Sequence, residues 1–142
     1  MPAGNLHAYL RGVGVEIMAA SDNVLRGGLT PKHINVPELL RVLRFEVLSD
    51  PVVRPVEMGP GLVTWPVPVS DFALFRATVT SGSVEVPGTG PRIALCLNGD
   101  VAVDDGAHPL ALRAGQVAFA AAATKPLTVT GSGEVYMATV GT

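Results

Sequence analysis

The 142 residues of the chain are enough for one ordinary domain with a real core, or for one small domain and a piece of another. Hydrophobic residues make up 48% of the sequence and charged residues only 15%, which excludes a disordered chain and indicates surface that other polypeptide covers. The formal net charge of -2 includes no run of Lys or Arg that could follow a phosphate backbone, so nucleic acid is not expected as a partner.

The sequence also limits the compartment. A single cysteine, Cys96, excludes an internal disulfide and fits a reducing cytoplasm, which is the expected location. The longest wholly apolar stretches, such as residues 117–123, are far shorter than the roughly 20 residues that a membrane helix needs. No basic region followed by an apolar segment opens the chain, so neither a secretory signal nor a membrane partner is expected.

Residues 5–10 and 13–19 are predicted to form two strands joined by a tight turn, because apolar side chains alternate with small or polar ones along the second segment. A two-residue hairpin loop places His7 opposite Glu16. Directly paired residues have Cβ atoms roughly 4.5 to 5.5 Å apart. The pattern therefore predicts that the imidazole and the carboxylate meet on one face, beside Tyr9.

An irregular connection and a short helix follow. Glycine and proline interrupt any regular structure over residues 21–31. Asn35 is a suitable N-cap with Glu38 three positions on, and an apolar stripe of leucine and valine predicts a helix after it. Prolines recur over residues 46–69, which are predicted to be a linker or an extended wrap.

The rest of the chain has an all-β pattern of short apolar runs separated by turn signals such as Asn98-Gly99 and Gly131-Ser132-Gly133. The predicted strands are 72–79, 83–86, 92–97, 101–103, 110–112, 117–120, 127–130 and 134–140. Short strands at this even spacing predict a mainly β fold, a sandwich or a jelly-roll barrel of the kind that includes cupins.

Unusual polar density marks the N-terminal third of the chain. Buried ionisable groups are costly unless paired, so several close together suggest a site; they are His7, Tyr9, Glu16, Asp22, Asn23, Arg26 and Lys32. Each also has a plain structural interpretation. A lone histidine on a strand is usually structural, with Glu16 as its hydrogen-bond partner, and Asp22 and Asn23 suit an ordinary turn. Arg26 beside two glycines could lie on the surface or approach a phosphate. Spacing alone leaves both interpretations open.

A resemblance to a known family adds to this pattern. Residues 2–10, 14–19, 21–33 and 36–40 resemble the signature region of type I, zinc-dependent mannose-6-phosphate isomerases. The remainder, with Phe72-Ala73-Leu74 and the run 91–96, is similar to the second, C-terminal cupin barrel of that family. The resemblance implies a C-terminal portion of such an enzyme. Its parts are a remnant of the catalytic cupin over 1–45, a linker over 46–69 and a cupin-like barrel over 70–142.

The resemblance also implies roles for individual residues. In the family, zinc is held by Gln, His, Glu and His, and the last of these matches His7. The other three ligands lie upstream in the intact enzyme and have no counterpart here, so zinc, one per intact enzyme, is expected to be absent from this chain. Arg26 matches the catalytic arginine and Asp22 a proposed participant in acid–base chemistry. The matches to the substrate pocket are Glu16, Lys32 and Tyr9.

The implied reaction interconverts the hexose 6-phosphates mannose 6-phosphate and fructose 6-phosphate through an enediol, in the carbohydrate metabolism that leads to GDP-mannose. It needs charge that stabilises an oxyanion, a base, and positive charge that holds the phosphate. One zinc ligand is too few, because a catalytic zinc ordinarily takes three. We therefore expect the chain to be inactive alone. Two alternatives stay open: an N-terminal half that completes the site in trans, and a non-catalytic carbohydrate-binding or structural β-barrel.

Overall fold

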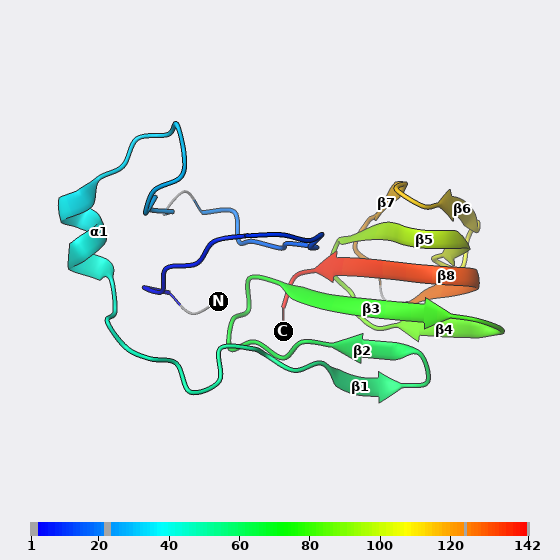
Figure 1. Cartoon of the computed structure of the whole chain (residues 1–142). Helices are drawn as coiled ribbons and strands as arrows, with labels where there is room; N and C mark the ends of the chain where they lie inside the picture. Colours follow the sequence, from blue (N-terminus) through cyan, green and yellow to red (C-terminus); the bar gives the residue numbers. More distant parts are fainter. Residues whose placement is uncertain (1–2, 22–23, 124, 142) are drawn as a thin grey trace. The chain divides into compact units, whose positions relative to one another are not determined.

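The computed structural model describes residues 3–21, 24–123 and 125–141, which form two compact units, Met1–Val52 and Val53–Thr142 (Figure 1). One short helix belongs to the first unit and the strands belong to the second. The elements are α1 (Val36–Val42), β1 (Val56–Gly59), β2 (Leu62–Thr64), β3 (Ala73–Val79), β4 (Ser83–Val86), β5 (Arg92–Asp104), β6 (Leu110–Arg113), β7 (Val117–Ala120) and β8 (Leu127–Thr139). None of the described helical segments is long and apolar enough to cross a membrane.

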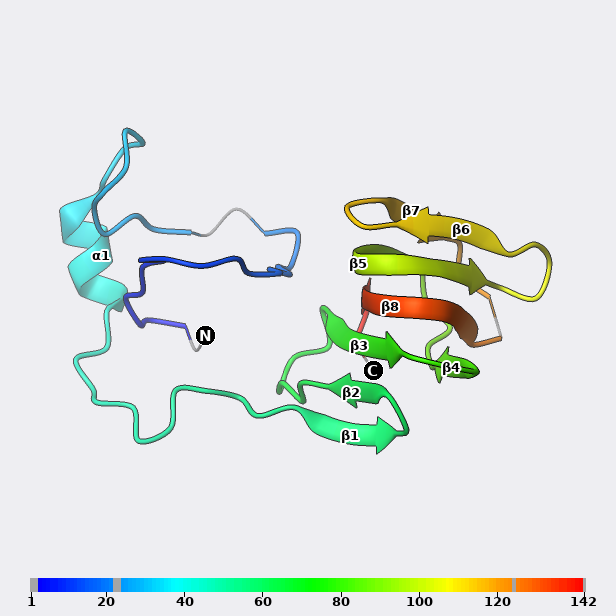
Figure 2. The same cartoon turned by 45° about the vertical axis from the view of Figure 1, so that its right-hand side comes forward.

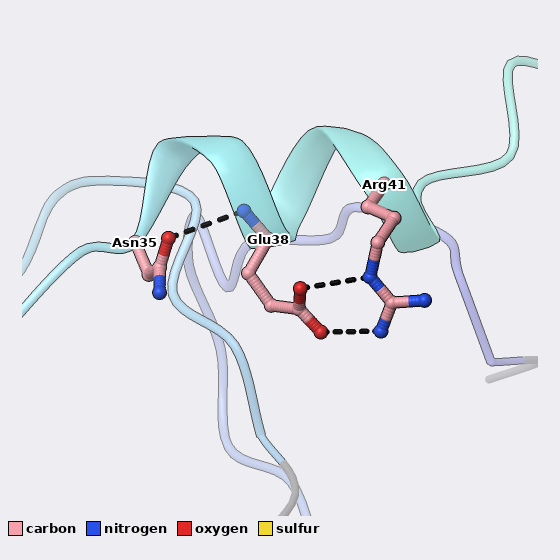
Figure 3. A network of polar contacts seen from close by, with 3 residues as sticks. All are labelled: Asn35, Glu38 and Arg41. Atoms are coloured by element: carbon pink, nitrogen blue, oxygen red, sulfur yellow. Dashed lines mark hydrogen bonds and ion pairs between the residues drawn. The ribbon is translucent and has the colours of Figure 1, made fainter.

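Helix α1 begins where its sequence predicts. The side-chain oxygen of Asn35 accepts a hydrogen bond from the backbone N–H of Glu38 at 3.1 Å, which is the expected N-cap (Figure 3). Arg41 then donates from Nε and Nη2 to the two oxygens of Glu38, at 2.8 and 2.5 Å. This hydrogen-bonded pairing lowers the pKa of Glu38 and raises that of Arg41. Both side chains are exposed, so the pair orders the helix surface and contributes little to stability.

The strand-turn-strand prediction for the start of the chain is wrong in one respect. The chain bends at Arg11 and Gly12 and returns alongside itself, as the dark blue trace shows in both views (Figures 1 and 2), but no strand is assigned over residues 3–21. Leu10 and Val13 flank the bend at 92% and 95% exposure. An isolated two-stranded ribbon is marginal in water, and these exposed side chains bury too little surface to stabilise a ladder.

Two short strands, β1 and β2, lie inside residues 46–69, for which the sequence predicts a linker or an extended wrap. They form an antiparallel hairpin, and β2 joins the main sheet beside β3 with Leu62 opposite Ala77. Prolines lie on both sides of these two short strands, so the sequence pattern here does not indicate strands. Trp65, just after β2, stacks on Tyr136 with ring centroids 6.2 Å apart and an interplanar angle of 16°. This stacking packs the tryptophan onto the barrel.

The antiparallel sheet has two halves joined by its two longest strands. In the wide half the order is β7, residues 92–97 of β5, residues 133–139 of β8, β3, β2 and β1. In the narrow half, β6 pairs with the end of β5, and β4 pairs with the start of β8. Buried side chains from both halves form one cluster, so the sheet curves around a single core.

Each of β5 and β8 was predicted as two strands separated by a turn, and both predictions are wrong. The glycines at these places allow the two strands to bend and approach closely, with a register shift between Cys96 and Asn98. Gly99 has φ +79, and a Cβ on it would lie 2.1 Å from the carbonyl oxygen of Ser132. A Cβ on Gly131, at φ +100, would lie 2.5 Å from the carbonyl oxygen of Asp100. In the sequence, a glycine that allows two strands to approach closely cannot be distinguished from a glycine in a turn that reverses the chain.

The apolar core lies wholly in the second unit, and none of the described residues in 3–52 is buried. Cys96 is fully buried and packs as a small hydrophobe, and burial raises the pKa of its thiol. Arg92 is only 1% exposed, and its guanidinium donates to the carbonyl oxygens of Gly88 and Lys125 at 3.0 and 2.9 Å. These bonds join two loops at one end of the barrel.

Candidate functional site

The candidate site lies on the bent segment that opens the chain. The hydroxyl of Tyr9 donates a hydrogen bond to Oε1 of Glu16 at 2.9 Å, across the bend. The carboxylate acceptor favours the protonated phenol and raises the pKa of Tyr9. Both side chains are exposed, so this pair is open to solvent and to ligands. Because the phenol donates its only proton to Glu16, the pair offers acceptor oxygens to the hydroxyls of a polyhydroxylated molecule.

His7 joins this pair through Tyr9. The two rings meet edge to face, with centroids 6.1 Å apart and an interplanar angle of 79°. Within the described part of the chain, the imidazole makes no hydrogen bond or ion pair, so both ring nitrogens are available to a metal or a substrate. The expected direct pairing of His7 with Glu16 is therefore corrected: the carboxylate bonds to the phenol.

No strand is assigned over residues 3–21, but a simple alignment of the two segments about the bend accounts for this change of partner. Counting outward from the bend puts Tyr9 opposite Gly14, which makes Tyr9 and Glu16 diagonal neighbours on the same face. Glycine leaves room there, and a tyrosine is long enough to span the diagonal. The predicted cluster of imidazole, phenol and carboxylate does form, although the position of the hydrogen bond could not be read from direct pairing alone.

The loop that carries the expected cations follows this segment. Arg26 is half-buried and has no hydrogen-bond or ion-pair partner among the described residues. A Cβ on Gly27 would lie 2.8 Å from Cδ2 of Leu6, so the loop returns to the opening segment. Lys32 is exposed, and its backbone N–H donates to Oγ1 of Thr30 at 3.2 Å. Asp22, the expected acid–base participant, lies outside the described residues.

Within the described part of the chain, no three His, Cys, Asp or Glu side chains come together in a way that could hold a metal ion. A zinc ion needs three or four such ligands. His7 can supply one of them, and these residues by themselves do not fit the metal. His108, the barrel's histidine, is exposed in the loop before β6.

No family profile matches the chain. Individual proteins, however, are similar to it in sequence. The chain is 40% identical over 131 residues to mannose-6-phosphate isomerase of Escherichia coli, a match that covers 91% of this chain and 33% of that protein. It is 41% identical over 87 residues to mannose-6-phosphate isomerase of Homo sapiens, covering 58% of this chain and 19% of that protein. The chain thus spans about a third or less of the length of these curated relatives.

The fold agrees. The structure of mannose 6-phosphate isomerase from Salmonella typhimurium, bound to its substrate fructose 6-phosphate and to zinc, superposes with a TM-score of 0.76 and 31% identity. The match covers 88% of this chain and 32% of that one. This chain is homologous to the C-terminal part of mannose-6-phosphate isomerases. The predicted mainly β, cupin-type architecture is confirmed by these mannose-6-phosphate isomerase structures. Further structures of the Salmonella isomerase are of variants with alanine in place of a histidine, a glutamate or an arginine.

Proposed function

We propose that this chain contributes one wall of the active site of a mannose-6-phosphate isomerase, the aldose–ketose isomerisation of mannose 6-phosphate and fructose 6-phosphate. One observation carries the proposal. In chain order, the histidine, glutamate and arginine replaced in the Salmonella isomerase variants are separated by nine and then ten positions. His7, Glu16 and Arg26 have the same separations, inside the most site-like segment of this chain.

The contacts of these residues support separate roles. His7 lies beside Tyr9 and makes no hydrogen bond within the described ranges 3–21, 24–123 and 125–141, which suits a single ligand to zinc, with the remaining ligands coming from another part of an intact enzyme. Bound zinc would supply positive charge for the oxyanion of the enediol. Tyr9 and Glu16 form a hydrogen-bonded pair that suits binding of sugar hydroxyls. The hydroxyls of the substrate can then donate hydrogen bonds to the acceptor oxygens of this pair.

The roles of the remaining residues follow from the charges of their side chains. Arg26 and Lys32 supply the positive charge that a phosphate or an enediolate requires, and a guanidinium can bind either through two parallel hydrogen bonds. We assign the catalytic electrostatic role to Arg26 and a binding role to Lys32. Asp22 is proposed as the acid–base group that moves the proton between C1 and C2. Zinc, the hexose 6-phosphate and the rest of an isomerase polypeptide are the implied cofactor, substrate and partner.

The first test concerns the 142-residue polypeptide by itself. With mannose 6-phosphate and excess zinc, we expect it to form fructose 6-phosphate no faster than a blank that contains zinc and no protein. The reason is that the chain offers only one of the several zinc ligands required. A coupled assay for fructose 6-phosphate measures this. Turnover well above the blank would contradict the proposed division of the site.

The companion test places the region in an intact enzyme. In a chimera, the 142 residues replace the matching region of the Escherichia coli isomerase. We expect Arg26→Ala to lower kcat by roughly 100-fold to 1,000-fold, the usual effect of removing one electrostatic stabiliser. Arg113→Ala is the control, because that arginine is exposed on the barrel. Equal activity of both variants would favour the alternative, a non-catalytic carbohydrate-binding or structural barrel.

A further inference from the structure

The outer surfaces of the two halves of the sheet differ in chemistry. Side chains alternate across a strand, so the residues between buried positions face outward. In the narrow half these outward residues are mostly polar or small: Ser83, Glu85, Asp100, Ala102, Asp104, Ala111, Arg113, Thr128 and Thr130. In the wide half, the outward residues of β5, β7 and the end of β8 are, apart from Glu134, apolar or aromatic: Ile93, Leu95, Leu97, Val117, Phe119, Tyr136 and Ala138. We call this second set the apolar face.

The members of the apolar face are neighbours. Ile93 lies opposite Phe119 on one side and opposite Ala138 on the other. In the next row, Leu95 lies between Val117 and Tyr136. Side chains paired in this way across adjacent strands touch, so the face is a continuous surface rather than a scatter of single residues.

The apolar face is most exposed along β5 and β7, whereas Leu95, Tyr136 and Ala138 are partly buried and Trp65 stacks on Tyr136. Phe119 is 70% exposed, Val117 57% and Ile93 51%. None of its seven members carries a charge; Arg76, opposite Tyr136, and Glu134, two positions before Tyr136 on β8, lie at its border. A contiguous apolar surface with a polar border is the composition of a protein interface, and depletion of charge at its centre is the most specific part of that signal.

The length of the relatives indicates what covers this face. The chain accounts for 33% of the Escherichia coli isomerase, so about two-thirds of such an enzyme lies outside the matched region. We propose that the apolar face is where the amino-terminal part of a mannose-6-phosphate isomerase packs onto the barrel, an inference that rests on the proposed function. The partner surface is accordingly apolar and uncharged at its centre, and the polar outer surface of the narrow half faces water.

The chimera with the Escherichia coli isomerase tests this through thermal unfolding. We expect the unaltered chimera to unfold in one calorimetric transition, because burial of the apolar face couples the barrel to the rest. Phe119→Lys should uncouple it, so that the barrel unfolds in a separate transition at lower temperature. The matched control is Ala111→Lys, which adds the same charge to an exposed strand position of the narrow half and should keep one transition.

Further measurements distinguish loss of this interface from other effects of the substitutions. Val117→Lys repeats the test at a neighbouring exposed position. Urea unfolding of each variant in the 142-residue chain should give an unchanged midpoint, which shows that the barrel itself is intact. A single transition in both lysine variants of the apolar face would overturn the proposal, as would a barrel that already unfolds separately in the unaltered chimera. If the 142-residue chain forms a dimer that Phe119→Lys abolishes while the chimera keeps one transition, a second copy is the occupant and the proposal is wrong.

Isomerase activity of the same chimera is recorded independently. An active chimera with one transition in both lysine variants contradicts only the interface. An inactive chimera in which Phe119→Lys uncouples the barrel contradicts only the proposed function.

Discussion

A single hydrogen bond, from Tyr9 to Glu16, organises the candidate site at the level of residues. It brings a phenol and a carboxylate together across the bend and holds the phenol ring against the edge of the His7 imidazole. The bond requires the protonated phenol, so it is present at neutral pH and is lost as pH rises through the raised pKa of Tyr9.

Replacing Glu16 by alanine should lower the pKa of Tyr9 towards that of free tyrosine, because both the hydrogen-bond acceptor and the negative charge are removed. The phenolate then forms at lower pH. The chain has two tyrosines, so the comparison is made in a Tyr136→Phe background, where absorbance at alkaline pH reports Tyr9 alone. Identical titrations with and without Glu16 would show that the hydrogen bond does not form in solution.

The cluster could be anticipated in part from the sequence. Alternation along residues 13–19 and a bend at Arg11-Gly12 predicted that His7, Tyr9 and Glu16 share a face, and the three do lie together. Which of the two, His7 or Tyr9, bonds to Glu16 depended on the length of the tyrosine and on the space above Gly14. These are properties of three-dimensional packing that a one-dimensional spacing does not contain.

At the level of elements, glycine has two roles in this barrel. Gly115 occupies a turn, where a left-handed φ of +83 is needed and no other atom approaches the position of a Cβ. Gly99 has nearly the same φ, +79, and in addition lies against the backbone of β8. Substitution of Gly115 therefore tests the cost of the backbone conformation alone, and substitution of Gly99 adds the cost of a steric clash with β8.

We expect Gly115→Ala to lower the free energy of unfolding by about 1 to 2 kcal/mol, the usual penalty for a left-handed alanine. Gly99→Ala should cost clearly more, or prevent folding, because its Cβ would lie 2.1 Å from the carbonyl oxygen of Ser132 and β5 would have to separate from β8. Urea unfolding followed by the fluorescence of Trp65, the single tryptophan, measures both. Equal losses would mean that the two strands do not approach closely at this corner.

For the whole molecule, burial is confined to one unit. Every member of the core cluster lies between Leu62 and Met137, and no described residue before Val53 is buried. The free energy that holds a fold against chain entropy comes mainly from such burial. The second unit therefore contains the elements of an autonomous domain, and the first holds the candidate site with little core of its own.

A polypeptide of residues 53–142 should consequently fold alone and unfold at the same urea midpoint as the 142-residue chain. Trp65 lies in both polypeptides, so its fluorescence allows a direct comparison. A substantially lower midpoint for the shorter polypeptide would show that residues 1–52 stabilise the barrel, contrary to the distribution of buried side chains.

The sequence by itself determined the mainly β class, helix α1 with its Asn35 cap, and most strand positions after Phe72, because period-two alternation and capping chemistry are local properties. It also indicated the residues of the candidate site. Only the tertiary structure decided that β5 and β8 run unbroken past their glycines, that β1 and β2 belong to the sheet, and that the wide half has an apolar outer face. Those features depend on which distant segments meet, and contacts between strands far apart in the chain leave no fixed spacing in the sequence.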